Sequence, residues 1–318
     1  MLISGSRVFN RLLVTLAFLT IGQNSLAQLT NHKILTMSGI REYKLYRPEN
    51  LKTSAPTVVA IHGCKQTAET FAQGSKLYDA ANKYGFNLLL PEQKKNSNPY
   101  NCWNWFLGLN QMRSGEPAII MQSIQDAQSK FNINSRELYL LGMSSGAAMS
   151  NILMNCYPKS FKAVASHSGV PYAATTLPLM AQTVLERGMF ISTYLTVQKG
   201  LLCGMYAKTK VPALVIQGAE DEVVPPIHAQ DLTDQFTEYN SYSYQGLELE
   251  ETSVERADGY NYTVEEWKDR SKRTIVKKVL IENLKHEWSG GDQSLPYNQS
   301  KGPDSTEMII KFFKGFGL

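Results

Sequence analysis

Residues 138–149 read Leu138-Tyr-Leu-Leu-Gly142-Met-Ser144-Ser-Gly146-Ala-Ala-Met149, an apolar run that passes through Gly-x-Ser-x-Gly into small residues. The pattern predicts a buried strand, a sharp turn with Ser144 at its apex, and a helix. A serine at such a turn takes strained backbone angles, so its neighbours two positions away must lack bulk, as Gly142 and Gly146 do. Backbone N–H groups at the head of the helix would face an incoming oxyanion. We therefore predict that Ser144 is a nucleophile rather than part of a chance match in a loop.

The length and composition of the chain suit one large globular domain. It has 318 residues, of which 43% are hydrophobic and 19% charged, and no internal repeat, low-complexity tract or long charge run is visible. The formal net charge of +4 is small and dispersed, which argues against a nucleic-acid partner. A polymer or small-molecule partner is the better expectation.

The N-terminus has the pattern of a secretory signal peptide. Arg7 and Arg11 supply a basic region, residues 12–22 an apolar core, and Ser25-Leu-Ala27 a small-x-small cleavage site. We expect a signal peptide over 1–27 and a single catalytic domain over 28–318. Because the apolar core is shorter than the about 20 residues of a membrane span, we expect no stable membrane association after cleavage. The expected location is extracellular or periplasmic.

Export would place the four cysteines in an oxidising compartment. Cys64, Cys102, Cys156 and Cys203 form an even set that allows three pairings. We favour Cys64 with Cys102 and Cys156 with Cys203. None of them has the Cys-x-x-Cys spacing of a zinc site, and we expect neither a metal nor an organic cofactor.

Apolar strands alternate with helical stretches along the mature chain. This alternation predicts a mostly parallel sheet with helices on both faces. Besides the strand and helix around Ser144, the expected strands are 41–47 (antiparallel), 57–61, 86–90 (stopped by Pro91), 161–165, 211–216 and 275–281, and the expected helices are 69–84, 116–131 and 305–313.

Two segments do not follow this alternation. Residues 175–200 are irregular, with large apolar residues among polar ones, and form a candidate cap over the site; a surface helical excursion is the alternative. Residues 231–272 are acidic and rich in tyrosine, and we predict only an excursion between strands. The loop after 86–90 is about thirty residues long, and loops of that length are usually functional.

An unassisted serine hydroxyl is a poor nucleophile and needs a base held in one orientation. Asp221 lies just beyond an expected strand and is our candidate acid, with Glu220 and Glu222 as rivals. His286 follows the last expected strand and is our candidate base. The chain thus supplies the three groups in the order Ser, Asp, His.

The oxyanion hole is expected to consist of two backbone amides. One is that of Ser145, the residue after the nucleophile, and the other that of Cys64, in the turn after strand 57–61. His62 stands at the end of that strand, so we expect it to shape the turn that presents the Cys64 amide. His167, at the end of the strand after the elbow, is a weaker candidate for the base.

These residues amount to a family resemblance. The chain resembles the extracellular polyhydroxybutyrate depolymerases, a group of α/β-hydrolases that also holds feruloyl and acetylxylan esterases. The motifs that carry the resemblance are Val59-Ala-Ile-His-Gly-Cys-Lys-Gln66, Pro91-Glu-Gln93, Asn101-Cys-Trp-Asn-Trp-Phe106, Gly142-Met-Ser-Ser-Gly146, Ser166-His-Ser-Gly-Val-Pro-Tyr172 and His286-Glu-Trp-Ser-Gly-Gly-Asp292.

The resemblance spans roughly residues 62–313. It implies an α/β-hydrolase fold with Ser144 as nucleophile, Asp221 as acid and His286 as base. It also implies that Cys64 pairs with Cys102, which would pin the oxyanion turn to the loop of Trp103 and Trp105.

The chain departs from many relatives in three places. Ser145-Gly146-Ala147 stands where they have Ala-Gly-Gly, and Glu287 where they have Ala. Many polymer-degrading relatives also carry a linker and a substrate-binding domain after the catalytic domain, whereas this sequence ends at Leu318. We therefore expect soluble oligomers or amorphous granules rather than crystalline polymer as substrates.

The expected function is that of a secreted serine esterase that hydrolyses short-chain poly(3-hydroxyalkanoate), such as polyhydroxybutyrate. Trp103, Trp105 and Trp288 are candidate walls for the acyl chain, with core packing as the alternative. A feruloyl or acetylxylan esterase is the alternative function. A catalytically silent binding protein is a more remote one.

Overall fold

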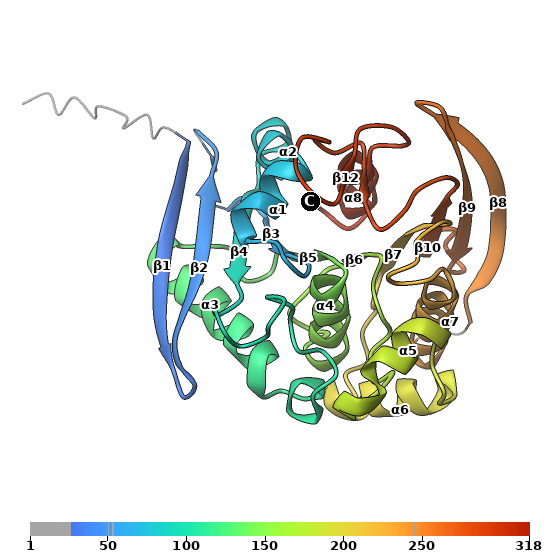
Figure 1. Cartoon of the computed structure of the whole chain (residues 1–318), viewed down its shortest axis with the longest axis horizontal. Coiled ribbons are helices and arrows are strands. Elements are labelled where there is room, and N and C mark those ends of the chain that lie inside the picture. Colours follow the sequence, from blue (N-terminus) through green and yellow to red (C-terminus); the bar gives the residue numbers. More distant parts are fainter. Residues whose placement is uncertain (1–26, 50, 53, 244–245) are drawn as a thin grey trace, which may run out of the picture.

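The computed structural model describes residues 27–49, 51–52, 54–243 and 246–318. Apart from Ala27, the expected signal peptide lies outside the described residues. A ten-stranded sheet runs through the molecule in the order β1-β2-β4-β3-β5-β6-β7-β10-β9-β8 (Figure 1). Its strands are β1 (Gln28–Thr36), β2 (Gly39–Arg47), β3 (Thr57–Ile61), β4 (Asn87–Glu92), β5 (Leu138–Met143), β6 (Val164–His167), β7 (Ala213–Gly218), β8 (Glu248–Ala257), β9 (Tyr260–Lys268) and β10 (Thr274–Ile281).

The central six strands, β4-β3-β5-β6-β7-β10, pair in parallel. Antiparallel strands extend the sheet at both ends, β2 with β1 beside β4, and β9 with β8 beside β10. The central strands are buried almost throughout, as expected for strands covered on both faces. This arrangement confirms the predicted α/β-hydrolase fold class.

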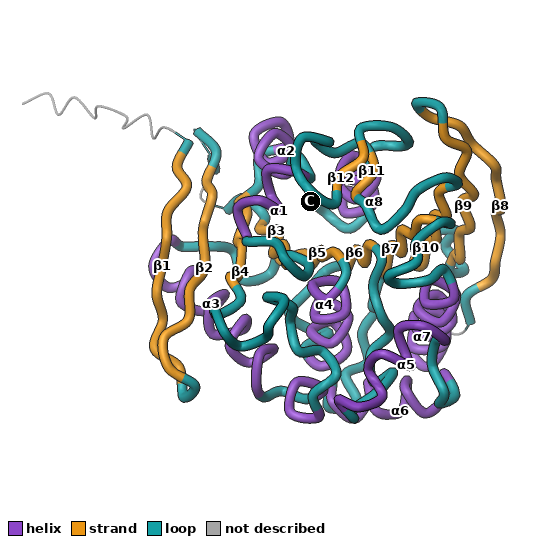
Figure 2. Tube along the Cα trace, viewed as in Figure 1, coloured by secondary structure: helices purple, strands orange, loops and turns teal. Residues whose placement is uncertain are grey.

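Helices cover both faces of the sheet (Figure 2). One face carries α1 (Ala68–Gly74), α2 (Leu77–Tyr84) and α8 (Ser305–Lys314), and the other carries α3 (Gly115–Phe131), α4 (Ser145–Cys156), α5 (Ala181–Arg187), α6 (Thr193–Cys203) and α7 (Ile227–Ser243). Two hydrophobic clusters flank the sheet, and successive residues of β3 alternate between them: Val58 and Ala60 face one cluster, Val59 and Ile61 the other. No helix within the described ranges is long and apolar enough to cross a membrane.

The single helix predicted over 69–84 is wrong, because the chain breaks between α1 and α2. Ser75 Oγ donates to the Phe71 carbonyl at 2.6 Å, and Lys76 takes a left-handed conformation with φ +56°. The predicted stop at Pro91 is also wrong, since β4 continues to Glu92. The strand predicted over 161–165 lies at Val164–His167 instead.

The two segments that broke the alternation are ordered parts of the fold. Residues 175–200 contain a 3₁₀ turn (Pro178–Met180), α5 and most of α6, and α6 packs against α4 and α7. Val184 and Val197 are buried there, so the segment contributes to the core; a capping role stays a prediction. The excursion 231–272 consists mainly of α7 and the β8–β9 hairpin. Two further short strands, β11 (Trp288–Ser289) and β12 (Asn298–Gln299), pair with each other.

Candidate active site

Ser144 lies at the sharp turn between β5 and α4. Its backbone angles, φ 57° and ψ −124°, are strained for a residue with a side chain. A Cβ on Gly142 would collide with the Gly146 carbonyl, and one on Gly146 with the carbonyls of Ile61 and His62. The two glycines are therefore needed because the elbow packs directly on the end of β3.

Asp221 and His286 are brought together from the loops after β7 and β10. His286 Nδ1 lies 2.8 Å from Asp221 Oδ2, and Asp221 is 2% exposed. Asp221 Oδ1 accepts hydrogen bonds from the amides of Val223 (2.9 Å) and Val224 (2.8 Å), which fixes the carboxylate. Its neighbours Glu220 and Glu222 are exposed, so neither rival is held in this way.

The environment keeps Asp221 ionised. Burial alone would raise its pKa, but hydrogen bonds from His286, the Val224 amide and Ser168 outweigh it and lower the pKa below the usual value. Gln217 Nε2 also donates to Asp221 Oδ2 at 3.1 Å. An ionised carboxylate can orient the imidazole and stabilise its protonated form during a reaction.

The end of β6 connects the nucleophile to the acid. The His167 carbonyl accepts from the Ser144 amide at 2.9 Å, and the next residue, Ser168, interacts with Asp221. The His167 ring is fully buried, and burial lowers its pKa to about 3. His167 therefore contacts the site through its backbone carbonyl. The histidine that is hydrogen-bonded to Asp221 is His286, not His167.

No hydrogen bond joins Ser144 to His286 in the part of the chain that the structure describes. Such catalytic bonds are often long in unliganded enzymes and tighten when substrate binds. Ser144 is 8% exposed, so its side chain lies in a largely enclosed position.

The turn after β3 lies against the elbow. A Cβ on Gly63 would come within 3.3 Å of Ser144 Cβ, and Cys64 Sγ lies 3.4 Å from Ser145 Oγ. Within the described ranges, the backbone N–H groups of Cys64 and Ser145 donate no hydrogen bond. Both amides could therefore donate to an oxyanion, and their role as an oxyanion hole stays a prediction.

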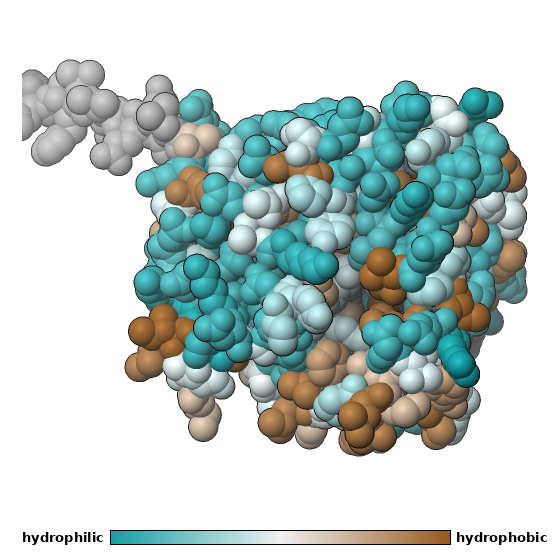
Figure 3. Space-filling model, in the orientation of Figure 1, coloured by the Kyte–Doolittle hydropathy of each residue, from teal (hydrophilic) through white to brown (hydrophobic). Residues whose placement is uncertain are grey.

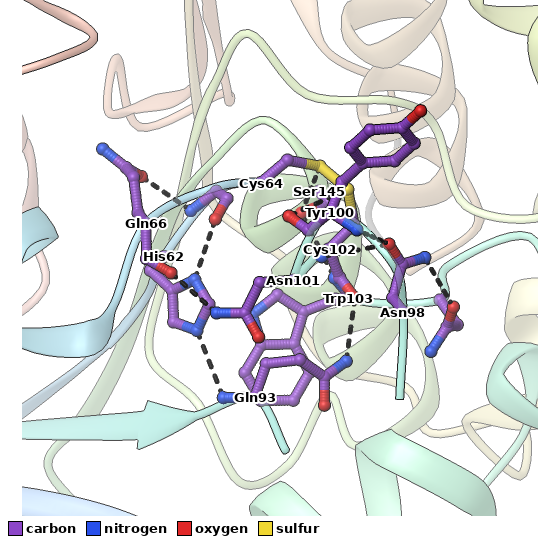
Figure 4. The surroundings of a disulfide bond; sticks show 12 residues. His62, Cys64, Gln66, Gln93, Asn98, Tyr100, Asn101, Cys102, Trp103 and Ser145 are labelled. Carbon is purple, nitrogen blue, oxygen red and sulfur yellow. Dashed lines mark hydrogen bonds between the residues drawn. A yellow bond between two sulfur atoms is a disulfide. The ribbon is translucent and has the colours of Figure 1, made fainter. Parts of the chain in front are cut away.

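Two disulfides have the pairing that the sequence analysis favours. Cys64 is bonded to Cys102, across 38 residues, and Cys156 to Cys203, across 47 residues. The first joins the oxyanion turn to the loop after β4, as Figure 4 shows. The second ties the end of α6 to the end of α4.

Comparison with known proteins places the chain in a family. The family model described as Esterase PHB depolymerase matches residues 41–257, more than half of the chain. The chain belongs to this family. Among curated relatives of this family member, poly(3-hydroxyalkanoate) depolymerase C of Paucimonas lemoignei is 26% identical over 75% of the chain. Feruloyl esterase B of Neurospora crassa is 33% identical over 52% of the chain, and a probable acetylxylan esterase A of Aspergillus fumigatus 29% over 76%.

The matched regions make up 56%, 57% and 66% of the lengths of these three relatives, respectively. Among solved structures, the acetyl xylan esterase from Aspergillus awamori superposes with a TM-score of 0.72, covering 90% of this chain and 99% of that one at 18% identity. That likeness supports the α/β-hydrolase fold of this family member.

The structure contradicts the interpretation of the three tryptophans as walls for a substrate. Trp103, Trp105 and Trp288 are 2%, 4% and 1% exposed. The Trp288 ring stacks on His167 with centroids 4.8 Å apart and donates from Nε1 to Thr306 Oγ1. These indoles pack in the core of this family member because the loops that carry them fold inward.

Sequence analysis missed Glu116, which organises the loop after β4. Its half-buried carboxylate accepts from Gln93 Nε2 (2.8 Å), from the Asn104 amide (2.7 Å) and side chain (2.7 Å), and from Asn110 Nδ2 (3.1 Å). Burial raises its pKa, although these hydrogen bonds oppose the shift. A glutamate in the first turn of a helix is common, so nothing in the sequence pattern points to this role.

Proposed function

We propose that this protein is a serine esterase. Ser144 Oγ attacks the ester carbonyl while His286 accepts its proton, and the amides of Cys64 and Ser145 bind the oxyanion. His286 then gives the proton to the leaving alkoxide, and a water molecule, activated by the same imidazole, hydrolyses the acyl-enzyme. The hydrogen bond between His286 and the fully satisfied Asp221 carboxylate, beside the strained Ser144, carries this proposal.

We further propose that the substrate is a short-chain poly(3-hydroxyalkanoate). Large apolar side chains that are at least one-third exposed occur on three segments that follow β4, β6 and β7. We call this set the apolar rim; it consists of Leu107, Leu109, Leu177, Leu179, Phe190, Val223 and Ile227. In Figure 3 apolar side chains gather along the lower edge of the view, where Figure 1 places α5 and α6.

Contacts join the three segments of the apolar rim to one another and to the acid loop. A Cβ on Gly108 would lie 3.9 Å from the Thr176 carbonyl oxygen, and one on Gly188 would lie 2.9 Å from a side-chain carbon of Ile227. The amide of Val223 donates to Asp221. Exposed apolar side chains on segments that lie next to one another and to the acid loop suit a water-insoluble polyester better than a hydrated polysaccharide.

Hydrolysis of feruloyl or acetyl esters of plant polysaccharide is the second candidate function. The relatives named feruloyl esterase B and acetylxylan esterase A favour it, since their sequence identities to the chain are as high as that of the depolymerase. The same triad would serve this reaction. A silent binding protein is disfavoured, because nothing but catalysis calls for a satisfied Asp221–His286 pair beside a strained serine.

We propose an extracytoplasmic location. Two disulfides, one of them at the oxyanion turn, suit an oxidising compartment.

The test is product analysis with amorphous polyhydroxybutyrate granules, feruloylated arabinoxylan and acetylated xylan in parallel. The proposal predicts hydroxybutyrate monomers or dimers from wild type and none from Ser144→Ala. Ser129→Ala changes an exposed serine on α3 and should behave as wild type. Release of ferulate or acetate with intact granules would favour the second candidate, and products from Ser144→Ala equal to those of wild type would refute the mechanism.

A further inference from the structure

In the part of the chain that the structure describes, one backbone N–H of the turn after β3 has no hydrogen-bond acceptor. The Gly63 amide donates to Gln66 Oε1 (2.9 Å), the Lys65 amide donates to the Tyr100 carbonyl (2.7 Å), and the Gln66 carbonyl accepts from Asn101 Nδ2 (2.8 Å). Within the described ranges only the Cys64 amide between them donates to nothing. Figure 4 shows the hydrogen bonds of Gln66 near the disulfide. The turn is therefore rigid and leaves one donor for a ligand.

The direction of that donor is set by the peptide bond that contains it. The Gly63 carbonyl and the Cys64 N–H belong to the same peptide unit, and the described residues contain no cis peptide bond. In a trans peptide the C=O and N–H bonds point in opposite directions. A group that holds the Gly63 carbonyl on one side therefore aims the Cys64 N–H to the other.

Two groups hold the Gly63 carbonyl oxygen: the Gln66 amide, at 3.4 Å, and the His62 ring, which lies closer. Its Nδ1 lies 2.8 Å from the Gly63 carbonyl oxygen, and its Nε2 lies 3.2 Å from the backbone nitrogen of Gln93. A backbone N–H can only donate, so Nε2 must be the unprotonated acceptor. Nδ1 then carries the hydrogen and donates to the Gly63 carbonyl.

The surroundings of His62 keep the ring neutral. It is fully buried and packs against Trp103, with ring centroids 5.5 Å apart, and burial lowers its pKa to about 4. The one charged group that faces it is Glu92, whose Oε1 lies 3.6 Å from Nε2 and whose Oε2 accepts from the Ala68 amide. A proton on Nε2 would set two donors, His62 and Gln93, against each other.

We propose that His62 is a positioning residue for the oxyanion hole. Its Nδ1–H holds the Gly63 carbonyl, so that the Cys64 N–H of the same peptide points at the place where negative charge develops on the ester oxygen. The Gln93 amide fixes the ring by donating to its other nitrogen. This inference rests on the proposed esterase function and adds the group that aligns one of its two oxyanion donors.

Two substitutions of His62 distinguish the role of its Nδ1 from the role of its Nε2. In His62→Asn the side-chain amide nitrogen replaces Nδ1 and can still donate to Gly63, whereas in His62→Gln the amide oxygen replaces Nε2 and accepts from Gln93 with no donor left for Gly63. The readouts are kcat and KM on a soluble chromogenic butyrate ester and the inhibition constant of a boronic acid, which forms a tetrahedral adduct at the serine.

We expect His62→Gln to lose roughly tenfold to a hundredfold in kcat with little change in KM, because an oxyanion donor acts mainly in the transition state. Boronate affinity should fall in parallel, and His62→Asn should retain most of both. Equal losses in the two variants, or none in His62→Gln, would overturn the inference while leaving the esterase function intact. A wild type as inactive as Ser144→Ala would instead remove the proposed function and this inference with it.

A measurement on wild type requires no substitution in the core. Nitrogen-15 NMR of histidine-labelled protein at pH 7 should show a neutral ring that is protonated at Nδ1, does not titrate between pH 8 and 5.5, and is absent from folded His62→Gln. This absence distinguishes His62 from the other buried rings, those of His167 and His228. Protonation of this ring at Nε2 would contradict the proposed hydrogen bond to Gly63.

Discussion

Asp221 differs from its acidic neighbours in burial and in the number of hydrogen bonds that its carboxylate accepts. It accepts from two backbone amides, a glutamine side chain and His286, whereas Glu220 and Glu222 point into solvent. A carboxylate with this many donors is pre-organised to hold the imidazole in one tautomer. The choice among three adjacent acids, left open by the sequence, is thus a choice of burial and hydrogen bonding.

Asp221→Asn should lower kcat by about 10³- to 10⁴-fold, because an amide in this place favours the wrong tautomer of His286. KM on a soluble butyrate ester should change little. Glu222→Gln is the matched control at an exposed position and should keep wild-type rates. A comparable loss of kcat in the two variants, or a larger loss in the control, would show that Asp221 is not the acid of the triad.

The candidate triad could be named from the sequence because each of its residues has a local signature. Ser144 stands between two glycines at a strand end, and Asp221 and His286 follow strands in the expected order. The tryptophans were misjudged because their exposure depends on how a long loop folds. A side chain such as Trp103 looks the same in a sequence whether it lines a pocket or fills a core.

The conformation of the loop between β4 and α3 depends on the side chain of Glu116. Glu116 accepts four hydrogen bonds from neutral donors and so holds Gln93, Asn104 and Asn110 together. The Cys102 carbonyl is tied to the same cluster through Gln93 Nε2 at 2.9 Å. The position of the disulfide loop beside the oxyanion turn is therefore coupled to this half-buried carboxylate.

Glu116→Gln should destabilise the protein by about 1–3 kcal/mol, because the new NH₂ group faces donors that lose their acceptor. Urea unfolding followed by tryptophan fluorescence measures this, since Trp103 and Trp105 lie in the loop. The control is Glu186→Gln, an exposed position on α5. A Glu116→Gln variant as stable as this control would show that the cluster does not need the charge.

The two disulfides should differ in what their loss does. Removing either by a pair of Cys→Ser substitutions should lower stability by about 2–4 kcal/mol. Loss of Cys64–Cys102 should also reduce kcat, because it frees the oxyanion turn, whereas loss of Cys156–Cys203 at the far end of α4 should leave the kcat of the folded protein near wild type. Four free thiols in exported wild-type protein, or equal kcat in the two double variants, would contradict this account.

Strands and helices with clear periodicity were predicted nearly in place, as the match of β3, β7 and β10 to their expected ranges shows. The break between α1 and α2 was missed because apolar spacing continues across it, while a Ser75 side-chain bond and a left-handed Lys76 end the helix. β1 was missed because its residues alternate weakly and pair only with β2 at the edge of the sheet.

On the scale of the whole molecule, three buried histidines, His62, His167 and His228, tie stability to pH, since burial lowers the pKa of each. The pKa of His62 is lowered to about 4 and that of His167 to about 3, chiefly by burial, from an ordinary value of 6.5. As pH falls below 6.5 these histidines become protonated in the unfolded chain but stay neutral in the folded protein. Stability is thus fully present above about pH 6.5 and is lost as pH falls towards the folded pKa values.

We expect the free energy of unfolding to fall between pH 6.5 and 5 with a slope that approaches about 1.4 kcal/mol per pH unit for each histidine. Burial raises the pKa values of Glu92 and Glu116, which oppose the trend at lower pH, so the window above pH 5 is the informative one. Urea titrations at several pH values measure the slope. His167→Phe keeps an aromatic ring beside Trp288 and should reduce this slope. A flat profile in wild type would contradict the burial of neutral histidines.

The central claim is that Asp221 and His286 make Ser144 the one nucleophile of the protein. The most direct measurement is intact and peptide mass spectrometry after reaction with diethyl 4-nitrophenyl phosphate, a probe that phosphorylates activated serines. The account predicts one diethylphosphoryl group on Ser144, incorporated in proportion to the loss of butyrate-ester hydrolysis, and much slower labelling in Asp221→Asn. Full inhibition with the label on another residue, or continued hydrolysis after complete labelling of Ser144, would contradict it.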